Sequence, residues 1–353
     1  MSIKWSSVRF RGDPDPLRLS SVAPREFSEV FEPLDYTPYY PRVIETSGRF
    51  TITRSAAVYP SLRLTKHTLY KRLYSFLQIN AISIASLATR GSESPARGNG
   101  QYGIIHSAWS TGYYHWLTEG LPRALLLKQA FPDATALLPT PRYAPFLESL
   151  AAVGQKDPEF FPGGKNVRLI DPILTTCPDY IATTAPSVLR NLRQHILKSF
   201  EVPQNTPSRK IYVSRARSRS RYVINEEEVT SSLIKKGFEV VYAEELSFRD
   251  QVILFNQSRV LVSIHGAGLS NALFMQPGSS VIELLPYRNG VLDYHRGRNS
   301  LRHDACYVRL SAAMNLNYSF IQCSQSTPRY KRTLNSDIHV NVNDLDRALE
   351  AVY

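Results

Sequence analysis

The chain has 353 residues, of which 43% are hydrophobic and 20% charged, and its formal net charge is +12. These proportions are those of a folded globular protein and exclude a disordered chain, a collagen-like fibre and an integral membrane protein. At about 100–200 residues per domain, the length predicts two domains or one large one. Arginine supplies 31 of the 42 basic residues, which favours planar, bidentate binding of phosphate or carboxylate. A nucleic acid, a membrane surface and a small phosphate ligand all fit this charge.

Cysteine is sparse, with only Cys177, Cys306 and Cys323. This number and spacing argue against a disulfide framework and a cysteine-built zinc site, and favour a reducing compartment. The first residues lack the apolar core of a secretory signal, and no apolar stretch is long enough to cross a bilayer. We therefore expect a cytoplasmic protein, with the inner face of the membrane as a peripheral location.

The first half of the chain begins irregularly and then alternates. Residues 1–45 are rich in Pro, Arg and Tyr and predict an irregular arm. Hydrophobic periodicity then predicts strands over 102–109, 134–139 and 166–174 and helices over 113–129, 143–154 and 185–200. Two prolines make 201–209 the best linker candidate.

The second half alternates more regularly. The pattern predicts strands over 210–214, 238–245, 259–266 and 279–286, separated by helices over 225–237, 247–258 and 269–278. Strands that alternate with short helices indicate a parallel, doubly wound sheet. The sequence thus predicts an α/β protein of two domains joined near 201–209, with a cleft between them.

A glycine-rich turn is the sharpest local motif. A buried strand ends at His265, and Gly266, Ala267 and Gly268 form a tight turn that opens a helix. Free backbone N–H groups at such a turn bind anions, and ligands of open α/β sheets lie at this end of the strands. Asn271 replaces the third glycine of a dinucleotide fingerprint, which argues against a nicotinamide or flavin. An ordinary strand-to-helix turn with a structural histidine is an equal alternative on this fragment alone.

A basic segment follows the first strand of the second domain. Six of the thirteen residues 209–221 are Arg or Lys. Arg215 and Arg221 could reach the same crevice as the glycine turn and neutralise a diphosphate without a metal. The alternatives are a solvated basic loop and a nucleic-acid patch.

His115 and Glu119 lie four residues apart in the first predicted long helix. A histidine and a carboxylate on one helical face can act as a general base and its orienting acid. The alternative is that His115 only packs beside Trp116. Pro122 predicts a kink or a helix start within this run.

Metal-binding patterns are weak. The two D-x-D strings, 13–15 and 344–346, lie near the termini, and His295, His303 and Cys306 do not have the spacing of a zinc site. We expect no cofactor and no essential metal.

Taken together, these segments resemble the family 61 glycosyltransferases over about residues 100–290. The matching residues are Tyr114-His115-Trp116, Glu119, Pro122, Ile211 to Arg215, Arg221, Asn225-Glu226, Gly237 to Val241, and His265 to Asn271 through Pro277-Gly278 to Ile282-Glu283. Residues 1–99 carry no match. Because the chain has few cysteines and no apolar leader, it looks more like the bacterial members associated with capsular or surface polysaccharide assembly.

The resemblance implies a GT-B fold, in which two Rossmann-like doubly wound domains face a cleft, and inverting, metal-independent transfer. Residues 1–200 would form the acceptor-side domain, 210–330 the nucleotide-sugar domain, and 331–353 a C-terminal helix that could pack back on the first domain. The donor would be a nucleoside-diphosphate sugar, with UDP favoured, and the acceptor a glycan or a lipid-linked glycan.

The resemblance also suggests roles for single residues. His115 would take the proton of the acceptor hydroxyl, with Glu119 as its orienter or as the alternative base. Arg215, Arg221 and the amides of 266–268 would stabilise the departing diphosphate. Donor-binding roles would also fall to His265, Glu283 at the ribose hydroxyls, Asn271, and Asn225, which could instead cap the following helix.

Two rival classes stay open. A nucleic-acid-binding protein would explain the charge, but only Tyr212 interleaves the basic run, so no nucleic acid is expected. A non-catalytic nucleotide-sugar or glycan-binding protein would use the same fold without turnover. The arginines outside the diphosphate pocket would suit an anionic membrane surface.

Overall fold

The structure is a computed structural model that describes residues 38–53, 100–107, 109–140, 145–162, 165–178, 181–218, 220–287, 305–326 and 336–352, and the backbone of 8–9, 58–60 and 92–93. The described residues fall into two compact units. The first ends at Phe200 and the second begins at Glu201. Within these ranges, no helix has both the length and the apolar character needed to cross a bilayer.

The main sheet of the first unit is mixed. Its strands run in the order β1-β2-β10-β6-β7-β8, with bounds Val8–Arg9, Arg42–Glu45, Ile173–Thr175, Tyr102–Ile104, Thr135–Pro139 and Glu159–Phe161. The last four are parallel, whereas β2 pairs antiparallel with both β1 and β10. The α/β class with parallel pairing is confirmed, and this sheet combines four parallel strands with antiparallel pairing at one edge.

A second sheet of the first unit corrects one predicted strand. Its order is β4-β3-β9-β5, with bounds Val58–Pro60, Arg49–Ile52, Asn166–Ile170 and Ser92–Glu93. The single strand predicted over 166–174 is wrong, because β9 and β10 belong to different sheets. The chain turns between them at Asp171, whose φ is 49°, and Pro172 has no N–H to continue the ladder.

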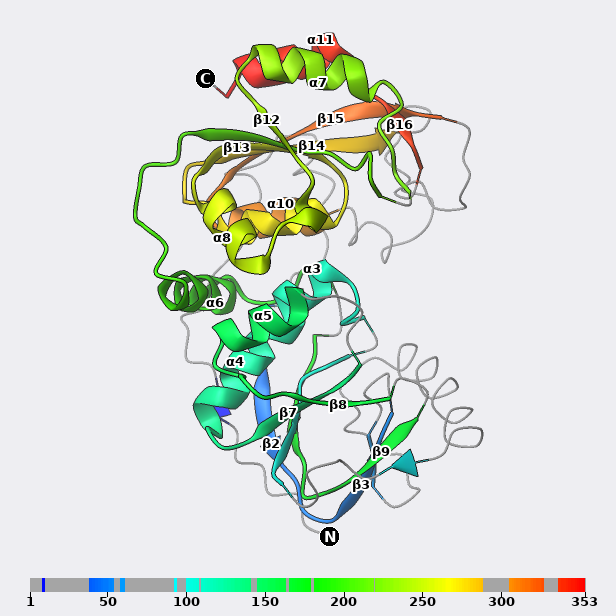
Figure 1. The fold of residues 1–353 in the computed structure, drawn as a ribbon, viewed down its shortest axis with the longest axis vertical. Coiled ribbons are helices and arrows are strands. Elements are labelled where there is room, and N and C mark those ends of the chain that lie inside the picture. Colours follow the sequence, from blue (N-terminus) through cyan, green and yellow to red (C-terminus); the bar gives the residue numbers. More distant parts are fainter. Residues whose placement is uncertain are drawn as a thin grey trace. The chain divides into compact units, whose positions relative to one another are not determined.

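The helices of the first unit pack against one another beside its main sheet (Figure 1). They are α3 (Tyr113–His115), the π-helical turn η2 (Trp116–Gly120), α4 (Leu121–Ala130), α5 (Pro145–Ala152) and α6 (Pro186–Ser199). α3, η2 and α4 follow one another without a break. Since α4 is buried along most of its length, it fixes the position of the short segment that precedes it.

The second unit contains the predicted parallel sheet. The order is β12-β11-β13-β14-β15-β16, with bounds Glu239–Val241, Arg209–Val213, Ser258–Ile264, Ser280–Tyr287, Asn317–Gln325 and Ile338–His339. The first five strands are parallel and β16 is antiparallel. If the five parallel strands are numbered along the chain, their order across the sheet is 2-1-3-4-5. The direction of winding therefore reverses between β11 and β13.

Helices cover both faces of this sheet (Figure 1). One face carries α7 (Glu226–Lys235) and α11 (Val342–Glu350), and the other carries α8 (Phe248–Asn256), the 3₁₀ helix η4 (Ala267–Phe274) and α10 (Cys306–Ala313). The short helix η3 (Ala243–Glu245) follows β12. The helix predicted over 269–278 corresponds to η4, which is a 3₁₀ helix and begins two residues earlier, at Ala267. Strands β15 and β16 and helix α10 were not predicted.

The C-terminal helix packs on its own unit, which corrects the prediction that it packs back on the first domain. Leu345 and Leu349 of α11 are buried in the core of the second unit. Asp346 accepts a hydrogen bond of 2.9 Å from Ser232 and lies 3.4 Å from the ammonium of Lys236, both near the end of α7. The apolar face of α11 is thus buried within the second unit.

His106, which follows β6, predicts how stability depends on pH. Burial and, to a smaller extent, the neighbouring Arg123 cation lower its pKa from 6.5 to about 4. The unfolded chain therefore binds a proton that the folded chain resists, so stability falls as the pH drops from about 6.5 towards about 4. Between pH 7 and pH 5 we expect a loss of about 2 kcal/mol from this group.

Urea unfolding at a series of pH values measures this loss. His106→Gln should reduce the pH dependence of the free energy of unfolding between pH 7 and pH 5. The control is His339→Gln, at an exposed position, which should leave this dependence unchanged. Equal pH dependence of the wild type and His106→Gln would contradict the prediction.

Candidate functional site

The carboxyl ends of β11 and β13 lie side by side where the winding reverses. Val213 pairs with Ser263 at the ends of the two strands, so the residues that follow them, Arg215 and His265, leave the sheet at the same edge. Open α/β sheets bind ligands in the crevice at such a point.

Arg215 and Arg221 converge on this edge. A Cβ placed on Gly266 would lie 3.2 Å from Nη1 of Arg215 and 3.3 Å from Nη1 of Arg221. Arg221 donates to the carbonyl of His265 at 3.1 Å, and Arg215 donates through Nε and Nη2 to the carbonyl of Ser220 at 3.3 and 3.1 Å. Sequence spacing placed the two arginines near the glycine turn, and the structure brings them together there.

The two guanidinium groups have neutral partners. No carboxylate among the described residues forms an ion pair with Arg215 or Arg221. Burial lowers the pKa of Arg215 to about 10, and the charge of Arg221 contributes to this shift. Arg221 also has a positive φ of 65°, which is uncommon for a residue other than glycine and concentrates at functional sites. Two close, half-buried cations without an acid favour a bound anion.

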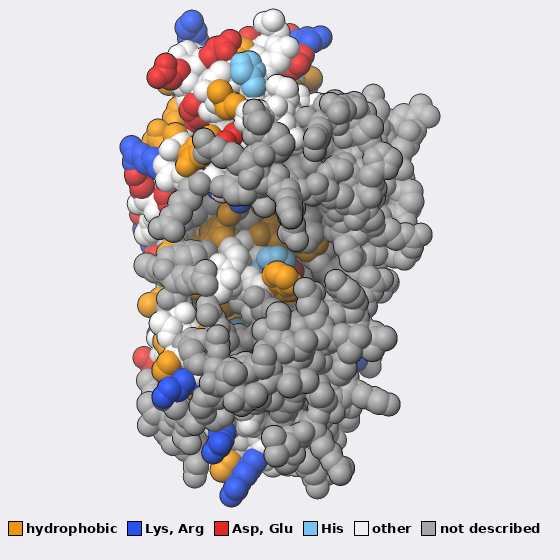
Figure 2. Space-filling model, turned by 90° about the vertical axis from the view of Figure 1, so that its right-hand side faces the viewer, with side chains coloured by type: hydrophobic (Ala, Val, Ile, Leu, Met, Phe, Trp, Pro, Cys, Tyr) orange, Lys and Arg blue, Asp and Glu red, His pale blue; other side chains and the backbone are white. Residues whose placement is uncertain are grey.

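Two other arginines of the basic segment are neutralised. Arg209 forms a two-bond pair with Glu239, and Arg217 pairs with Glu245 and lies 3.9 Å over the ring of Tyr242. On the face drawn in Figure 2, the described Lys and Arg side chains are spread out rather than gathered into one patch. The described part of 209–221 is therefore not a free basic surface.

The two glycines of the turn are needed because neighbouring side chains leave no room for a Cβ, not because the backbone adopts a conformation that only glycine allows. Gly266 has an extended φ of 165°, which any residue adopts, but a side chain there would meet the two guanidinium groups. A Cβ on Gly268 would lie 2.8 Å from Cγ1 of Val213, so this glycine lets η4 pack against β11. The first backbone N–H groups of η4, near Ala267 and Gly268, have no partner within the helix.

His265 and Glu283 form a buried pair. Nδ1 of His265 is hydrogen-bonded to one carboxylate oxygen of Glu283, and the hydroxyl of Tyr318 donates to the other at 2.6 Å. The ring of Tyr307 lies edge-on to His265, with 5.0 Å between centroids. Glu283 is 0% exposed and its two oxygens bond to His265 and Tyr318, and its role at the ribose hydroxyls stays a prediction. Its partner is His265.

Asn225 and Asn271 have structural partners, and their donor-binding role stays a prediction. Asn225 occupies the position before α7 but makes no side-chain cap. Its amide exchanges two hydrogen bonds with the backbone of Val340, at 2.8 and 3.0 Å. Asn271 is 0% exposed and donates to Gln251 of α8 at 3.0 Å. Both residues hold elements of the second unit together.

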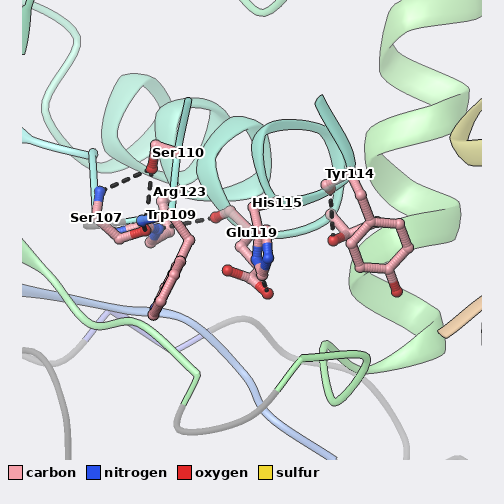
Figure 3. A network of polar contacts seen from close by, with 8 residues as sticks. Ser107, Trp109, Ser110, Tyr114, His115, Glu119 and Arg123 are labelled. Atoms are coloured by element: carbon pink, nitrogen blue, oxygen red, sulfur yellow. Dashed lines mark hydrogen bonds and ion pairs between the residues drawn. The ribbon is translucent and has the colours of Figure 1, made fainter. Parts of the chain in front are cut away.

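The first unit carries a second histidine–glutamate pair. Nδ1 of His115 lies 3.0 Å from Oε1 of Glu119 (Figure 3). The pair spans the junction of α3 and η2, where the N–H of Leu121 bonds to the carbonyl of Trp116, five residues back. Because Pro122 has no N–H and its ring crowds the preceding turn, regular α-helical bonding cannot pass this point. Single π-helical turns inside α-helices are frequent at functional sites.

Arg123 secures this turn from the inside. It is 0% exposed and donates through Nε to the carbonyl of Glu119 at 2.8 Å and through Nη1 to the carbonyl of His106 at 3.3 Å. Figure 3 shows its guanidinium between Glu119 and the Ser107 turn. A buried cation that serves backbone carbonyls can be read only from the fold, and the sequence pattern gave no signal for it.

Trp109 lies beside His115 and was also missed. The two rings stack with 6.1 Å between centroids and 29° between planes, and they project to the same side in Figure 3. Trp109 is 55% exposed, although its backbone is fixed in a turn closed by Ser107 and Ser110. A rigidly held, exposed tryptophan beside a histidine offers a flat aromatic surface to a ligand.

Metal ligands do not gather in the described part of the chain, where no group of three or more His, Cys, Asp or Glu side chains could hold an ion. Asp344 and Asp346 are paired with Arg347 and Lys236. The string 13–15, His295 and His303 lie outside the described residues.

Comparison with known proteins gives one family. Residues 113–282 match the model of the family described as Glycosyltransferase 61. The match begins at the helix of His115 and ends in β14, one residue before Glu283, so it includes His115, His265 and the two arginines.

Three relatives illustrate the similarity. The EGF domain-specific O-linked N-acetylglucosamine transferase of Drosophila melanogaster is 29% identical over 123 residues, which is 33% of this chain and 24% of that protein. The Protein O-linked-mannose beta-1,4-N-acetylglucosaminyltransferase 2 of Canis lupus familiaris is 38% identical over 76 residues, and that of Xenopus tropicalis 40%. The latter matches cover 20% of this chain and 13% of each relative. The chain thus spans a quarter or less of these curated relatives, and residues 113–282 are similar to the family described as Glycosyltransferase 61.

Proposed function

We propose that the chain transfers a sugar from a nucleoside-diphosphate sugar to a hydroxyl group of a glycan or lipid-linked glycan. The observation that carries the proposal is the convergence of Arg215 and Arg221 on Gly266 at the switch point of a doubly wound sheet. Two guanidinium groups with only neutral partners suit a diphosphate, because each can bind phosphate oxygens in a planar, two-bond geometry.

The donor side follows from the charge that develops during transfer. As the bond between the anomeric carbon and the diphosphate breaks, its electron pair moves to the phosphate oxygen. Arg215, Arg221 and the free amides at 266–268 would offset this charge, which supports transfer without an essential metal. The named relatives make N-acetylglucosamine the first sugar to test, and UDP is its expected carrier.

The acceptor side rests on the first unit. In an inverting transfer, the acceptor oxygen attacks the anomeric carbon from the face opposite the diphosphate, and His115 takes the hydroxyl proton. Glu119 holds the imidazole through Nδ1, which leaves Nε2 to accept that proton. The exposed face of Trp109 would stack against the apolar face of an acceptor sugar ring. The GT-B arrangement of the two units is part of this proposal.

The proposed setting is a cytoplasmic step of surface polysaccharide assembly, of the kind associated with bacterial members of the family. Support comes from the cysteines, all three of which are buried and form no disulfide, as expected in a reducing compartment. Arginines outside the diphosphate site would help to hold the enzyme at an anionic membrane that carries a lipid-linked acceptor.

The donor class is tested by a thermal-shift panel of UDP, GDP, CMP and their sugars. Stabilisation by UDP and UDP-sugars supports the proposal. The absence of a shift with every nucleotide would contradict it. Sugar release or transfer from the bound nucleotide-sugar, with and without EDTA, separates an enzyme from a non-catalytic binding protein and tests metal independence.

Substitutions should separate donor binding from chemistry. Arg215→Ala and Arg221→Ala should each weaken binding of UDP about 10–100-fold, because each removes charge-assisted hydrogen bonds. His115→Ala should leave UDP binding unchanged and lower turnover by about 10²–10⁴-fold. Calorimetry measures the first effect and a sugar-transfer assay the second.

The matched control for the arginines is Arg347→Ala on α11, whose side chain is 75% exposed and should be silent in both assays. Normal UDP affinity in both arginine variants would contradict the diphosphate site. Near-normal turnover of His115→Ala would show that another group is the base.

Trp109→Ala should raise the KM for the glycoside acceptor without changing the KM for the donor, and Trp109→Phe should restore part of the loss. The reason is that a stacked sugar ring loses its aromatic surface, which is worth about 1 kcal/mol or roughly fivefold. The control is Leu147→Ala, another exposed hydrophobic residue of the same unit. An unchanged acceptor KM in Trp109→Ala would rule out the stacking surface.

A further inference from the structure

The histidine at the end of β13 joins the glycine turn to a buried carboxylate. His265 precedes Gly266 directly and is 6% exposed. Its Nδ1 is bonded to Glu283 of β14, and no hydrogen bond to its other ring nitrogen occurs within the described part of the chain. The ring therefore has one nitrogen bonded to Glu283 and one, Nε2, without a hydrogen bond to the described residues.

Glu283 is an unusual residue for the core of a sheet. It is 0% exposed, and the residues before and after it in β14, Ile282 and Leu284, are apolar. Burial of a carboxylate costs several kcal/mol unless it is paired and hydrogen-bonded, and apolar side chains often stabilise a core as well or better. Both oxygens have donors, His265 Nδ1 and Tyr318. The arrangement therefore controls the imidazole more directly than it stabilises the sheet.

The hydrogen-bond roles fix what Nε2 can do. An ionised carboxylate only accepts hydrogen bonds, so the proton lies on Nδ1 of His265. A neutral ring would then present a lone pair at Nε2, which repels a phosphate oxygen. A protonated ring presents an N–H donor and a positive charge.

Resting on the proposed function, we propose that His265 binds the donor diphosphate as an imidazolium, and that Glu283 is the positioning residue that holds it in this state. The leaving phosphate oxygen then accepts a hydrogen bond from Nε2–H while it gains the electron pair of the breaking bond. The proton stays on His265, so no covalent step involves the ring.

The surrounding charges make protonation depend on the ligand. Arg221 donates to the carbonyl of His265, and Arg215 lies beside Gly266. Two cations and one carboxylate thus lie beside the imidazole in the empty site. Tyr307 of α10 is neutral, since burial raises its pKa well above the ordinary value, and Tyr318 of β15 only donates to Glu283. A diphosphate reverses the balance, so its binding takes up a proton.

Calorimetry of the full chain measures this linkage. The probe is UDP-N-acetylglucosamine, because it lacks the terminal phosphate that titrates near neutral pH in UDP. Titrations in two buffers of different ionisation enthalpy give the number of protons taken up. For the wild type we expect net uptake, at most one proton, and an affinity that falls with rising pH by up to tenfold per unit.

Three variants separate the roles. Glu283→Gln should bind less tightly at neutral pH, with proton uptake moved to lower pH, because the amide can still accept from Nδ1 but carries no charge. His265→Gln should bind without uptake and with little pH dependence. Tyr318→Phe is the matched control that leaves the carboxylate charged, and it should retain the uptake.

The outcomes distinguish this proposal from the proposed function. Binding of the nucleotide-sugar by the wild type without proton uptake between pH 5.5 and 8.5 would overturn the imidazolium proposal alone. The imidazolium proposal would also be overturned if His265→Gln took up as many protons on binding as the wild type and showed the same pH dependence of affinity. Failure of every nucleotide-sugar to bind would overturn the proposed function, and this proposal with it.

Discussion

The reversal of winding between β11 and β13 is the constraint on which the second unit depends. Because β12 and β13 lie on opposite sides of β11, the connections that leave β11 and β13 diverge and leave a crevice at the carboxyl edge of the sheet. Both connections are tightly fixed. Glu226 accepts hydrogen bonds from Tyr212 and Ser214 at the end of β11, and Gly268 brings η4 close to the same strand. The two arginines and His265 therefore converge through the topology rather than through proximity in sequence.

Each unit contains a fully buried Glu or Arg side chain that contacts one of the two histidine sites. In the second unit Glu283 binds His265 directly. In the first unit Arg123 binds the carbonyl of Glu119, the partner of His115. Buried ions are costly unless their hydrogen bonds are satisfied, so they are weak contributors to stability and strong determinants of local geometry. The same physical device thus positions two different imidazoles.

Helices and strands could be predicted from the sequence more accurately than the pairing of the strands and the contacts of single side chains. Periodicity and caps located α7, whose first turn is acidic and which ends before Gly237 with a φ of 82°, and the buried run of β13. The spacing of His115 and Glu119 and the position of the arginines after β11 also anticipated local geometry. The role of Glu283 could not be predicted, because it depends on Tyr318, 35 residues away. The division of 166–174 into two sheets was hidden for a similar reason, since strand pairing is set by distant segments such as β2 and β3.

The π-helical turn has a consequence for insertions and deletions. It contains one residue more than regular α-helical bonding needs, and Gly120 is held against the Trp116 ring so closely that a Cβ would lie 2.9 Å from it. Loss of one residue between Trp116 and Gly120 would remove this extra residue. The segment before it would then rotate by about 100° about the helix axis. His115 would turn away from Trp109 while α4 kept its packing, so the length of this turn sets the direction of the imidazole independently of the core.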